Sequence, residues 1–375
     1  MEQEIRTGDP ATDRECMEEM KRSYEAAGMT VEVAPLPGGG FRIKAEMAQV
    51  AAFTTPQGQT VQMPAAGSYD LGGVEGAHLK MAAMQGDLRP TLDFMAQARA
   101  AGDWDDQVFM AELVGQECPE PVLTQACAQM PGAAEPRVVR AAHLIKRAWD
   151  ARGSGTADTI TDEGAGTMVQ ALDGARRDLA EAAQFDPYSP APHAFMIEVA
   201  TLHETLSRKD GQAAFSWALE RHPTNLLAFR NMLRLAARKW GGSHDEALQV
   251  ARMAASRAAR GNDLQACLFN AHIEIWFYQK QFEGNEPAAQ AYLANPQVRA
   301  ELDRAFDAWV VPGYQARRVS PPQLHFAAFW YHLVGDQARL KRAVAAINMV
   351  PVSHPWHYLG EPTMMWTQAL QRGMT

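Results

Sequence analysis

The sequence has 375 residues, of which 47% are hydrophobic, and its net charge is −9 at pH 7. This apolar content excludes a globally disordered chain, and the length allows either two or three domains or one extended array of repeats. The acidic balance argues against a nucleic-acid-binding protein, because such proteins concentrate positive charge on one surface. Membrane-spanning helices are not expected, since no apolar run approaches the roughly 20 residues that such a helix needs.

Residues 1–76 are predicted to form a small α+β unit that ends in a linker. A capped helix is expected over residues 9–28, where Gly28 ends the helical pattern. Alternating apolar residues around glycine-containing turns predict two β-hairpins. Their strands are expected over residues 31–33, 41–43, 50–55 and 60–63, and the linker over residues 64–76. The glycine triplet at 38–40 lacks the Gly-Lys-Ser/Thr of a phosphate-binding loop, so we interpret it as a turn.

Residues 77–375 are predicted to form a helical-repeat domain. Segments with helical periodicity follow one another there, separated by Gly, Pro, Asp and Asn, and residues 152–166 interrupt them as a flexible loop. The expected helices cover residues 88–101, 104–114, 119–129, 135–151, 167–185, 190–206, 212–221, 224–239, 244–259, 262–280, 286–294, 296–311, 320–334, 336–348 and 355–371.

Two prolines indicate a repeat. Pro187 and Pro223 each precede a predicted helix, at a spacing close to the roughly 34 residues of a tetratricopeptide repeat. Proline suits the first turn of a helix because the N–H groups of that turn have no intrahelical partner. Helix pairs of this length bury their apolar faces by stacking on one another. The pattern therefore predicts a mainly α fold, a tetratricopeptide-like α-solenoid behind a small N-terminal α+β appendage of helix and β-hairpins.

Five segments resemble a group of uncharacterised bacterial tetratricopeptide-like helical-repeat proteins. They are RAAHLIKRAWDARGS at 140–154, AAQFDP at 182–187, KWGGSH at 239–244, AHIE at 271–274 and PWHYLGEP at 355–362. The resemblance covers about residues 85–375. It implies the repeat fold and assigns no role to any residue.

The stretch KWGGSHDEAL at 239–248 contains residue types of a catalytic loop, but it is explained better as a helix junction. The apolar series Leu226, Phe229, Leu233, Ala236 and Trp240 predicts one helix that ends at Trp240. Gly241 or Gly242 can take the left-handed conformation that ends a helix. Ser243 and Glu246 have the spacing of a capping box, which begins the next helix. His244 alone has no structural role in this scheme and is a candidate binding residue.

His272 and Glu274 are the polar residues of an otherwise apolar helical segment. They lie roughly 160° apart around a helix axis, because successive residues are about 100° apart. Such groups need polar partners on neighbouring helices. They either form structural hydrogen bonds or belong to a pocket with His244, and in the second case the protein is an enzyme or a small-ligand-binding protein.

Arg230, Arg234 and Arg238 recur every four residues on the face of their helix opposite the apolar series. If this helix is the first of its pair, the three arginines line the concave groove of the solenoid, where guanidinium groups bind carboxylates. The first hypothesis is therefore a non-enzymatic scaffold that binds an acidic protein or peptide. The alternative is that the three arginines lie on a helix face exposed to solvent. A second basic series, Arg137, Arg140 and Arg147, gives a weaker signal.

No catalytic residue, metal site or cofactor is predicted. The sequence lacks H-E-x-x-H and G-x-S-x-G, and His325 and His332 lie two helical turns apart. His354-Pro-Trp-His357 is interpreted as a packed aromatic corner. The scattered cysteines Cys16, Cys118, Cys127 and Cys267 and the polar N-terminal stretch indicate reduced thiols in a cytoplasmic protein. A homodimer formed by edge-to-edge pairing of the N-terminal hairpins is a further alternative.

Overall fold

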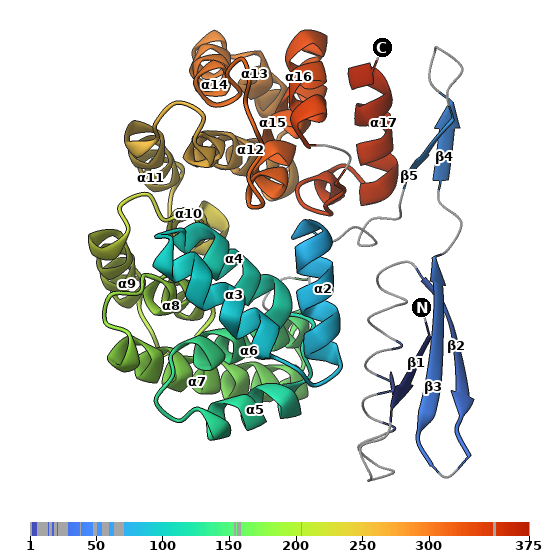
Figure 1. Ribbon diagram of the computed structural model, residues 1–375. Coiled ribbons are helices and arrows are strands. Elements are labelled where there is room, and N and C mark those ends of the chain that lie inside the picture. Colours follow the sequence, from blue (N-terminus) through green and yellow to red (C-terminus); the bar gives the residue numbers. More distant parts are fainter. Residues whose placement is uncertain are drawn as a thin grey trace.

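The chain is mainly helical (Figure 1). The structure, a computed structural model, describes residues 2–5, 14, 17, 18, 21, 29–37, 39–47, 51–54, 60–63, 71–153, 155, 159–203, 205–347 and 350–374. Within these residues the helices are α2 (Gly73–Met84), α3 (Arg89–Ala100), α4 (Trp104–Gly115), α5 (Glu120–Gln129), α6 (Glu135–Arg152), α7 (Asp162–Phe185), α8 (Ala191–Leu202), α9 (Arg208–Arg221), α10 (Leu226–Ala236), α11 (His244–Arg257), α12 (Ala266–Gln281), α13 (Glu286–Ala294), α14 (Pro296–Trp309), α15 (Ser320–Val334), α16 (Gln337–Ile347) and α17 (Pro362–Met374). Three short 3₁₀ helices are η2 (Arg238–Trp240), η3 (Asp263–Gln265) and η4 (Trp356–Tyr358).

The described strands precede α2 and form antiparallel ladders in two sheets. They are β1 (Glu2–Ile5), β2 (Met29–Pro35), β3 (Phe41–Met47), β4 (Ala51–Thr54) and β5 (Thr60–Met63). The first sheet has the order β1-β3-β2, with Pro35 opposite Phe41, and the second joins β4 to β5. Both predicted hairpins are thus present, and β1 adds a strand that was not predicted. The predicted helix over 9–28 lies almost entirely outside the described residues, as do residues 64–70 of the linker predicted over 64–76. The end of that linker is wrong, because residues 73–76 are the first turn of α2, a helix that was not predicted.

Several predicted helix boundaries are wrong: α9 begins at Arg208 rather than at residue 212, and α8 ends at Leu202 rather than at residue 206. Three further differences concern the expected loop and the candidate site. Thr161 accepts a hydrogen bond from Gly164 N at 3.0 Å and begins α7, so residues 162–166 of the expected loop are helical. The helix expected over 224–239 ends at Ala236, because Ala237 is extended (ψ 143°) before η2 begins. The helix expected over 355–371 begins only at Pro362, after η4. The extended residue Ala237 and the late start of α17 place residues of η2 and residues 354–358 in the candidate site described below.

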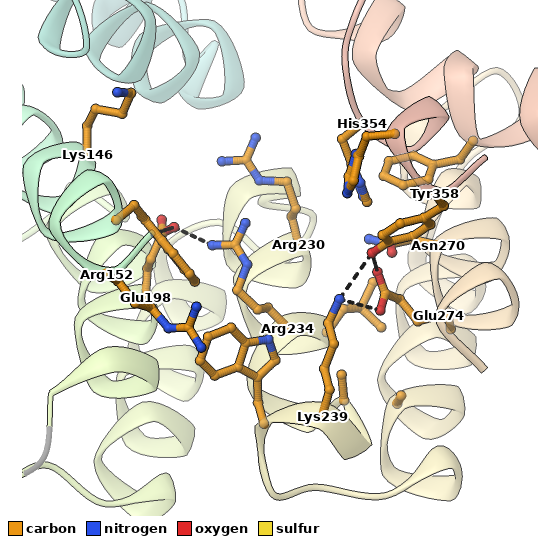
Figure 2. A pocket seen from close by; sticks show the side chains of 18 of the residues that line it. Lys146, Arg152, Glu198, Arg230, Arg234, Lys239, Asn270, Glu274, His354 and Tyr358 are labelled. Atoms are coloured by element: carbon orange, nitrogen blue, oxygen red, sulfur yellow. Dashed lines mark hydrogen bonds and ion pairs between the residues drawn. The ribbon is translucent and has the colours of Figure 1, made fainter. Parts of the chain in front are cut away.

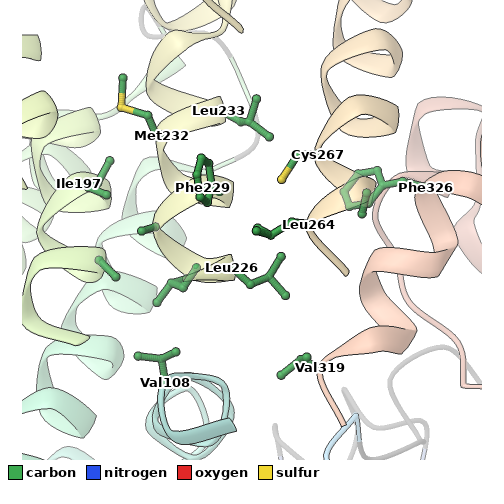
Figure 3. Packing of buried hydrophobic residues seen from close by; sticks show 14 of the residues in the cluster. Val108, Ile197, Leu226, Phe229, Met232, Leu233, Leu264, Cys267, Val319 and Phe326 are labelled. Atoms are coloured by element: carbon green, nitrogen blue, oxygen red, sulfur yellow. The ribbon is translucent and has the colours of Figure 1, made fainter. Parts of the chain in front are cut away.

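The helices α4, α6, α8, α10, α12 and α15 form an inner row in which each packs on the next. Their partners along the chain, such as α7, α9, α11 and α16, pack on the outside of this row (Figure 1). Buried apolar residues run continuously through the helices from Leu79 to Leu370. Figure 3 shows the part around α10, where Leu226, Phe229 and Leu233 lie in one cluster with side chains of α4, α8 and α12. Burying each such side chain stabilises the fold by about 1.5–3 kcal/mol.

The first turn of α4 contacts the segment that leads into α15. Arg317 binds Asp103 at 3.0 Å and Asp105 at 3.3 Å. Arg318 binds Asp106, and it binds Glu75 of α2 at 2.5 Å. We call this group of ion pairs the clasp. It joins residues more than two hundred positions apart in sequence, so the two ends of the inner row are tied together.

Candidate functional site

The inner row encloses a cavity of about 570 Å³. Its walls come from α4, α6, α8, α10, α12 and α15, from the turn after α10 and from residues 354–358. Among the described residues, the charged groups that line it are Glu112, Lys146, Asp150, Arg152, Glu198, Arg230, Arg234, Lys239 and Glu274. A volume of this size falls within the roughly 300–1,000 Å³ of small-molecule sites.

Arg230 and Arg234 point into the cavity from successive turns of α10 (Figure 2). A carboxylate holds each of them: Glu112 of α4 accepts from Arg230 at 2.5 Å, and Glu198 of α8 accepts from Arg234. Nε of Arg230 is buried and has no hydrogen-bond partner in the described part of the chain. A guanidinium carries five N–H donors, so both side chains are fixed in position and keep donors for a ligand.

Glu198 is the carboxylate that fixes the orientation of two side chains lining the cavity. It is only 6% exposed and also accepts a hydrogen bond from the indole of Trp149 at 2.8 Å. Burial alone would raise its pKa, but the positive charges of Arg234 and Arg230 hold the pKa of Glu198 below its ordinary value. Glu198 is therefore ionised, and it fixes both Arg234 and Trp149.

Two tryptophans form an aromatic wall beside the arginines. Trp149 of α6 meets Trp240 of η2 edge to face, with ring centroids 5.4 Å apart. The guanidinium of Arg234 lies 5.0 Å from the Trp149 ring, and that of Arg152 lies 4.9 Å from the Trp240 ring. Cations over indole faces are attracted by the ring quadrupole. The wall therefore combines apolar surface with positive charge.

The opposite wall holds a hydrogen-bonded triad of Lys239, Glu274 and Tyr358. Lys239 Nζ lies 2.7 Å from a Glu274 oxygen and donates to the Tyr358 hydroxyl at 3.1 Å. That hydroxyl donates to the other Glu274 oxygen at 2.5 Å, and the Tyr358 ring stacks on Phe277 at 3.8 Å. Burial and the nearby Glu274 charge raise the pKa of Tyr358 well above its ordinary value, so the phenol keeps its proton.

His354 enters the cavity from the segment before α17 (Figure 2). Its ring lies 5.1 Å from Phe326 and 5.2 Å from both His357 and Tyr358. Burial, and then the charges of His357, Lys239, Arg234 and Arg230, hold the pKa of His354 well below its ordinary value. The imidazole is therefore neutral at pH 7. Trp356 of the same segment is fully buried, as expected for an aromatic corner, whereas His354 and His357 line the cavity.

Only two residues of the predicted arginine row reach the cavity. Arg238 lies outside it, 3.2 Å from Glu283 and 4.8 Å from the Tyr278 ring. The reason is the break at Ala237, which ends the four-residue periodicity before Arg238. The second series lies elsewhere: Arg137, Arg140 and Arg147 pair with Glu181, Asp178 and Glu120.

The structure does not bring the predicted trio of His244, His272 and Glu274 into one pocket. His272 is 1% exposed on the far side of α12, where it bonds the Tyr292 hydroxyl at 2.6 Å and Glu301 at 3.3 Å. His244 meets the Tyr278 ring edge-on at 5.3 Å. It shares with Glu274 a separate cleft of only about 10 Å³, too small for a ligand. Glu274 alone of the three lines the large cavity.

Sequence reasoning missed most of the cavity. The sequence predicts only a helix junction at Lys239 and Trp240. It assigns no binding role to Trp149, Glu198 or Tyr358. A signal existed at Glu198, a lone carboxylate in the apolar segment AFMIEVATL, since such a group needs a partner. For the other residues that line the cavity, the sequence pattern gives no comparable signal.

No group of three or more His, Cys, Asp or Glu that could hold a metal ion occurs among the described residues. The described helices include none with the length and apolar character to cross a membrane. Comparison with protein-family models, with curated proteins and with solved structures gives no match to this chain. The chemistry of the cavity therefore has to be inferred from its own side chains.

Proposed function

We propose that the protein binds a small anionic ligand in the cavity. The observation that carries this proposal is the pair Arg230 and Arg234, which point into one space from one face of α10. Each donates from one terminal nitrogen to a carboxylate, and its other terminal nitrogen has no partner among the described residues. Their buried carboxylate partners fix the guanidinium groups before a ligand arrives, which lowers the entropic cost of binding. Carboxylates and phosphates are the groups that match a guanidinium fork.

A small ligand fits better than an extended peptide. The clasp ties α4 to the segment before α15, and residues 354–358 stand at the side of the cavity facing Lys239. These contacts limit the length of an extended chain that the inner face can receive. The tryptophan wall and Phe326 supply the apolar surface that small-molecule sites use beside a few polar groups.

A peptide-binding scaffold is the second candidate. Helix pairs with an inner row of helices support a tetratricopeptide-like solenoid, and the two arginines lie on its inner face. In this version the ligand's anionic group is the end or an acidic side chain of a peptide that enters the cavity from outside.

The test is titration calorimetry of the full chain with three kinds of probe: sodium glutarate, inorganic phosphate, and a hexaglutamate peptide with free or amidated C-terminus. Wild type is compared with Arg230→Lys/Arg234→Lys, which keeps the charges but removes the forks. Arg238→Lys is the matched control, because this arginine lies outside the cavity.

Binding of a small anion that the double variant loses and Arg238→Lys retains is the expected result. Binding of the peptide alone would favour the scaffold. If no probe binds wild type, or if all bind the double variant equally well, the proposal is wrong.

A further inference from the structure

We infer that the cavity recognises a small dianion, a short dicarboxylate whose two ends contact opposite walls. This inference rests on the proposed function and specifies the ligand class. One end lies between Arg230 and Arg234, and the other lies at Lys239 and Asn270.

The wall opposite the arginines also has free donors. The ammonium of Lys239 has three N–H groups, and it uses two of them, for Glu274 at 2.7 Å and for the Tyr358 hydroxyl at 3.1 Å. Asn270, one turn before Glu274 on α12, lines the same wall, and its side-chain amide bonds to no other described residue. Both walls therefore present N–H groups to the space between them.

The carboxylates of the cavity are all paired with cationic side chains, which disfavours a ligand with a cationic end. Among the described lining residues, Glu112 binds Arg230 and Glu198 binds Arg234. In the same way Asp150 binds Lys146 at 2.5 Å, and Glu274 binds Lys239. A ligand ammonium would have to displace one of these cations, whereas a second anionic group meets donors that are already in place. An amino acid or a diamine therefore fits less well than a dicarboxylate.

The cavity also has apolar lining. Leu233 and Ala237 of the α10 side, Ala271 of α12 and Phe326 of α15 line it together with the arginines and the triad. A hydrocarbon spacer loses no hydrogen bonds against these side chains, whereas a strongly hydrated spacer would have to be desolvated there. The structure thus assigns one anionic group to each wall and a short carbon chain to the middle.

The test compares three probes of similar length by titration calorimetry: glutarate with two carboxylates, butyrate with one, and γ-aminobutyrate with a carboxylate and an ammonium. We expect glutarate to bind at least about tenfold more tightly than either of the others, because only glutarate places an anionic group at both walls; tenfold corresponds to about 1.4 kcal/mol. Lys239→Gln should reduce glutarate affinity to that of butyrate and leave butyrate unchanged. Arg238→Gln, the neighbouring residue with its side chain outside the cavity, should change neither.

Asn270→Ala is the second variant, because it leaves the triad intact if Lys239→Gln unfolds the chain. It should weaken glutarate and not butyrate. Equal binding of butyrate and glutarate, with no effect of Lys239→Gln or Asn270→Ala, would overturn the dianion inference while leaving the anion-binding function standing. Failure of all three probes to bind wild type would overturn the dianion inference, and failure of inorganic phosphate and of the peptide as well would overturn the anion-binding function.

Discussion

The indole N–H of Trp356 donates a hydrogen bond to Nδ1 of His325 at 2.8 Å. Because an indole can only donate, Nδ1 is unprotonated, and the proton of the ring sits on Nε2, which donates to the Val350 carbonyl at 2.7 Å. Both ring nitrogens are therefore used, and His325 is fully buried. This one imidazole attaches the segment that carries His354 and Tyr358 to α15.

The first prediction is that acid destabilises the protein through His325. Burial lowers its pKa from 6.5 to about 4, so the folded chain binds fewer protons than the unfolded chain between these values. The stability that depends on neutral His325 is thus present above pH 6.5 and is lost as the pH falls towards 4, with a total of about 3 kcal/mol. Urea unfolding across this range measures it.

The control for the first prediction is His325→Gln, whose amide can accept from Trp356 and donate to Val350 but cannot titrate. It should lose the part of the acid dependence that His325 contributes. His193 and His332, which burial also shifts to a pKa of about 4, contribute similar parts, and His354, whose pKa lies well below its ordinary value, contributes as well. An unchanged pH dependence in His325→Gln would contradict this assignment.

The second prediction couples ligand binding to proton uptake at His354. In the free protein the charges of His357, Lys239, Arg234 and Arg230 add to burial in lowering the pKa of this group. A bound anion offsets those charges and raises the pKa of His354, while burial still holds it below its ordinary value. Binding therefore takes up protons, and glutarate affinity increases as the pH falls through the acidic range, below 6.5, in which His354 titrates. Calorimetry in two buffers of different ionisation enthalpy gives the proton number. His354→Gln should abolish the uptake, and an equal proton number in that variant would refute the coupling.

The third prediction concerns the turn that positions Lys239 and Trp240. Gly241 has a φ of +82° with no neighbour near an added Cβ, so Gly241→Ala should cost about 1 kcal/mol of unfolding free energy. A Cβ at Gly242 would clash with the Ala236 carbonyl oxygen, so Gly242→Ala must displace the turn itself. We expect the second variant to be the less stable and to lose glutarate affinity at equal folded fraction. Similar stability and affinity in both would argue against this account.

Local features of this fold were predictable because they depend on neighbours in sequence. Ser243 does begin α11 as predicted, since its hydroxyl accepts from Glu246 N at 3.1 Å. The carboxylate of Glu246 was expected to complete the capping box, but it binds Arg208 of α9 at 3.0 Å instead. The cap depends on four consecutive residues, whereas the pairing of Glu246 with Arg208 depends on which helix packs beside α11.

The cavity could not be predicted for the same reason. It is lined by residues of helices far apart along the chain and of one C-terminal segment, and nothing local to Lys239 indicates that Tyr358 lies beside it. The predicted arginine row is wrong at Arg238 because no glycine or proline marks the break at Ala237. The periodic pattern of the sequence therefore continues past the real helix end. The helical period correctly placed His272 and Glu274 on opposite faces of α12. It could not show which of the two faces lines the cavity.

The fourth prediction separates the cap from the site. Ser243→Ala removes the acceptor for Glu246 N and should lower the unfolding free energy by about 1 kcal/mol. Glutarate affinity should not change, because Ser243 does not line the cavity while Lys239 and Trp240 do. Ser243→Asp, which keeps an N-cap acceptor, should restore the stability. Loss of affinity in Ser243→Ala without a change in stability would show that the junction acts directly on the ligand.

The last prediction tests whether the clasp holds the inner row closed. Asp105 is 7% exposed, accepts from the backbone N–H of Leu226 at 3.0 Å and binds Arg317 at 3.3 Å. Asp105→Ala leaves a buried N–H and a half-buried cation without their partner, so we expect a loss of about 3–5 kcal/mol in denaturant unfolding. Asp105→Asn retains an acceptor for Leu226 and should lose less. Asp87→Ala, which removes only the exposed pair with Arg89, should change little. If Asp105→Ala is as stable as Asp87→Ala, the two ends of the inner row do not depend on this contact, and the cavity is held closed by its apolar walls alone.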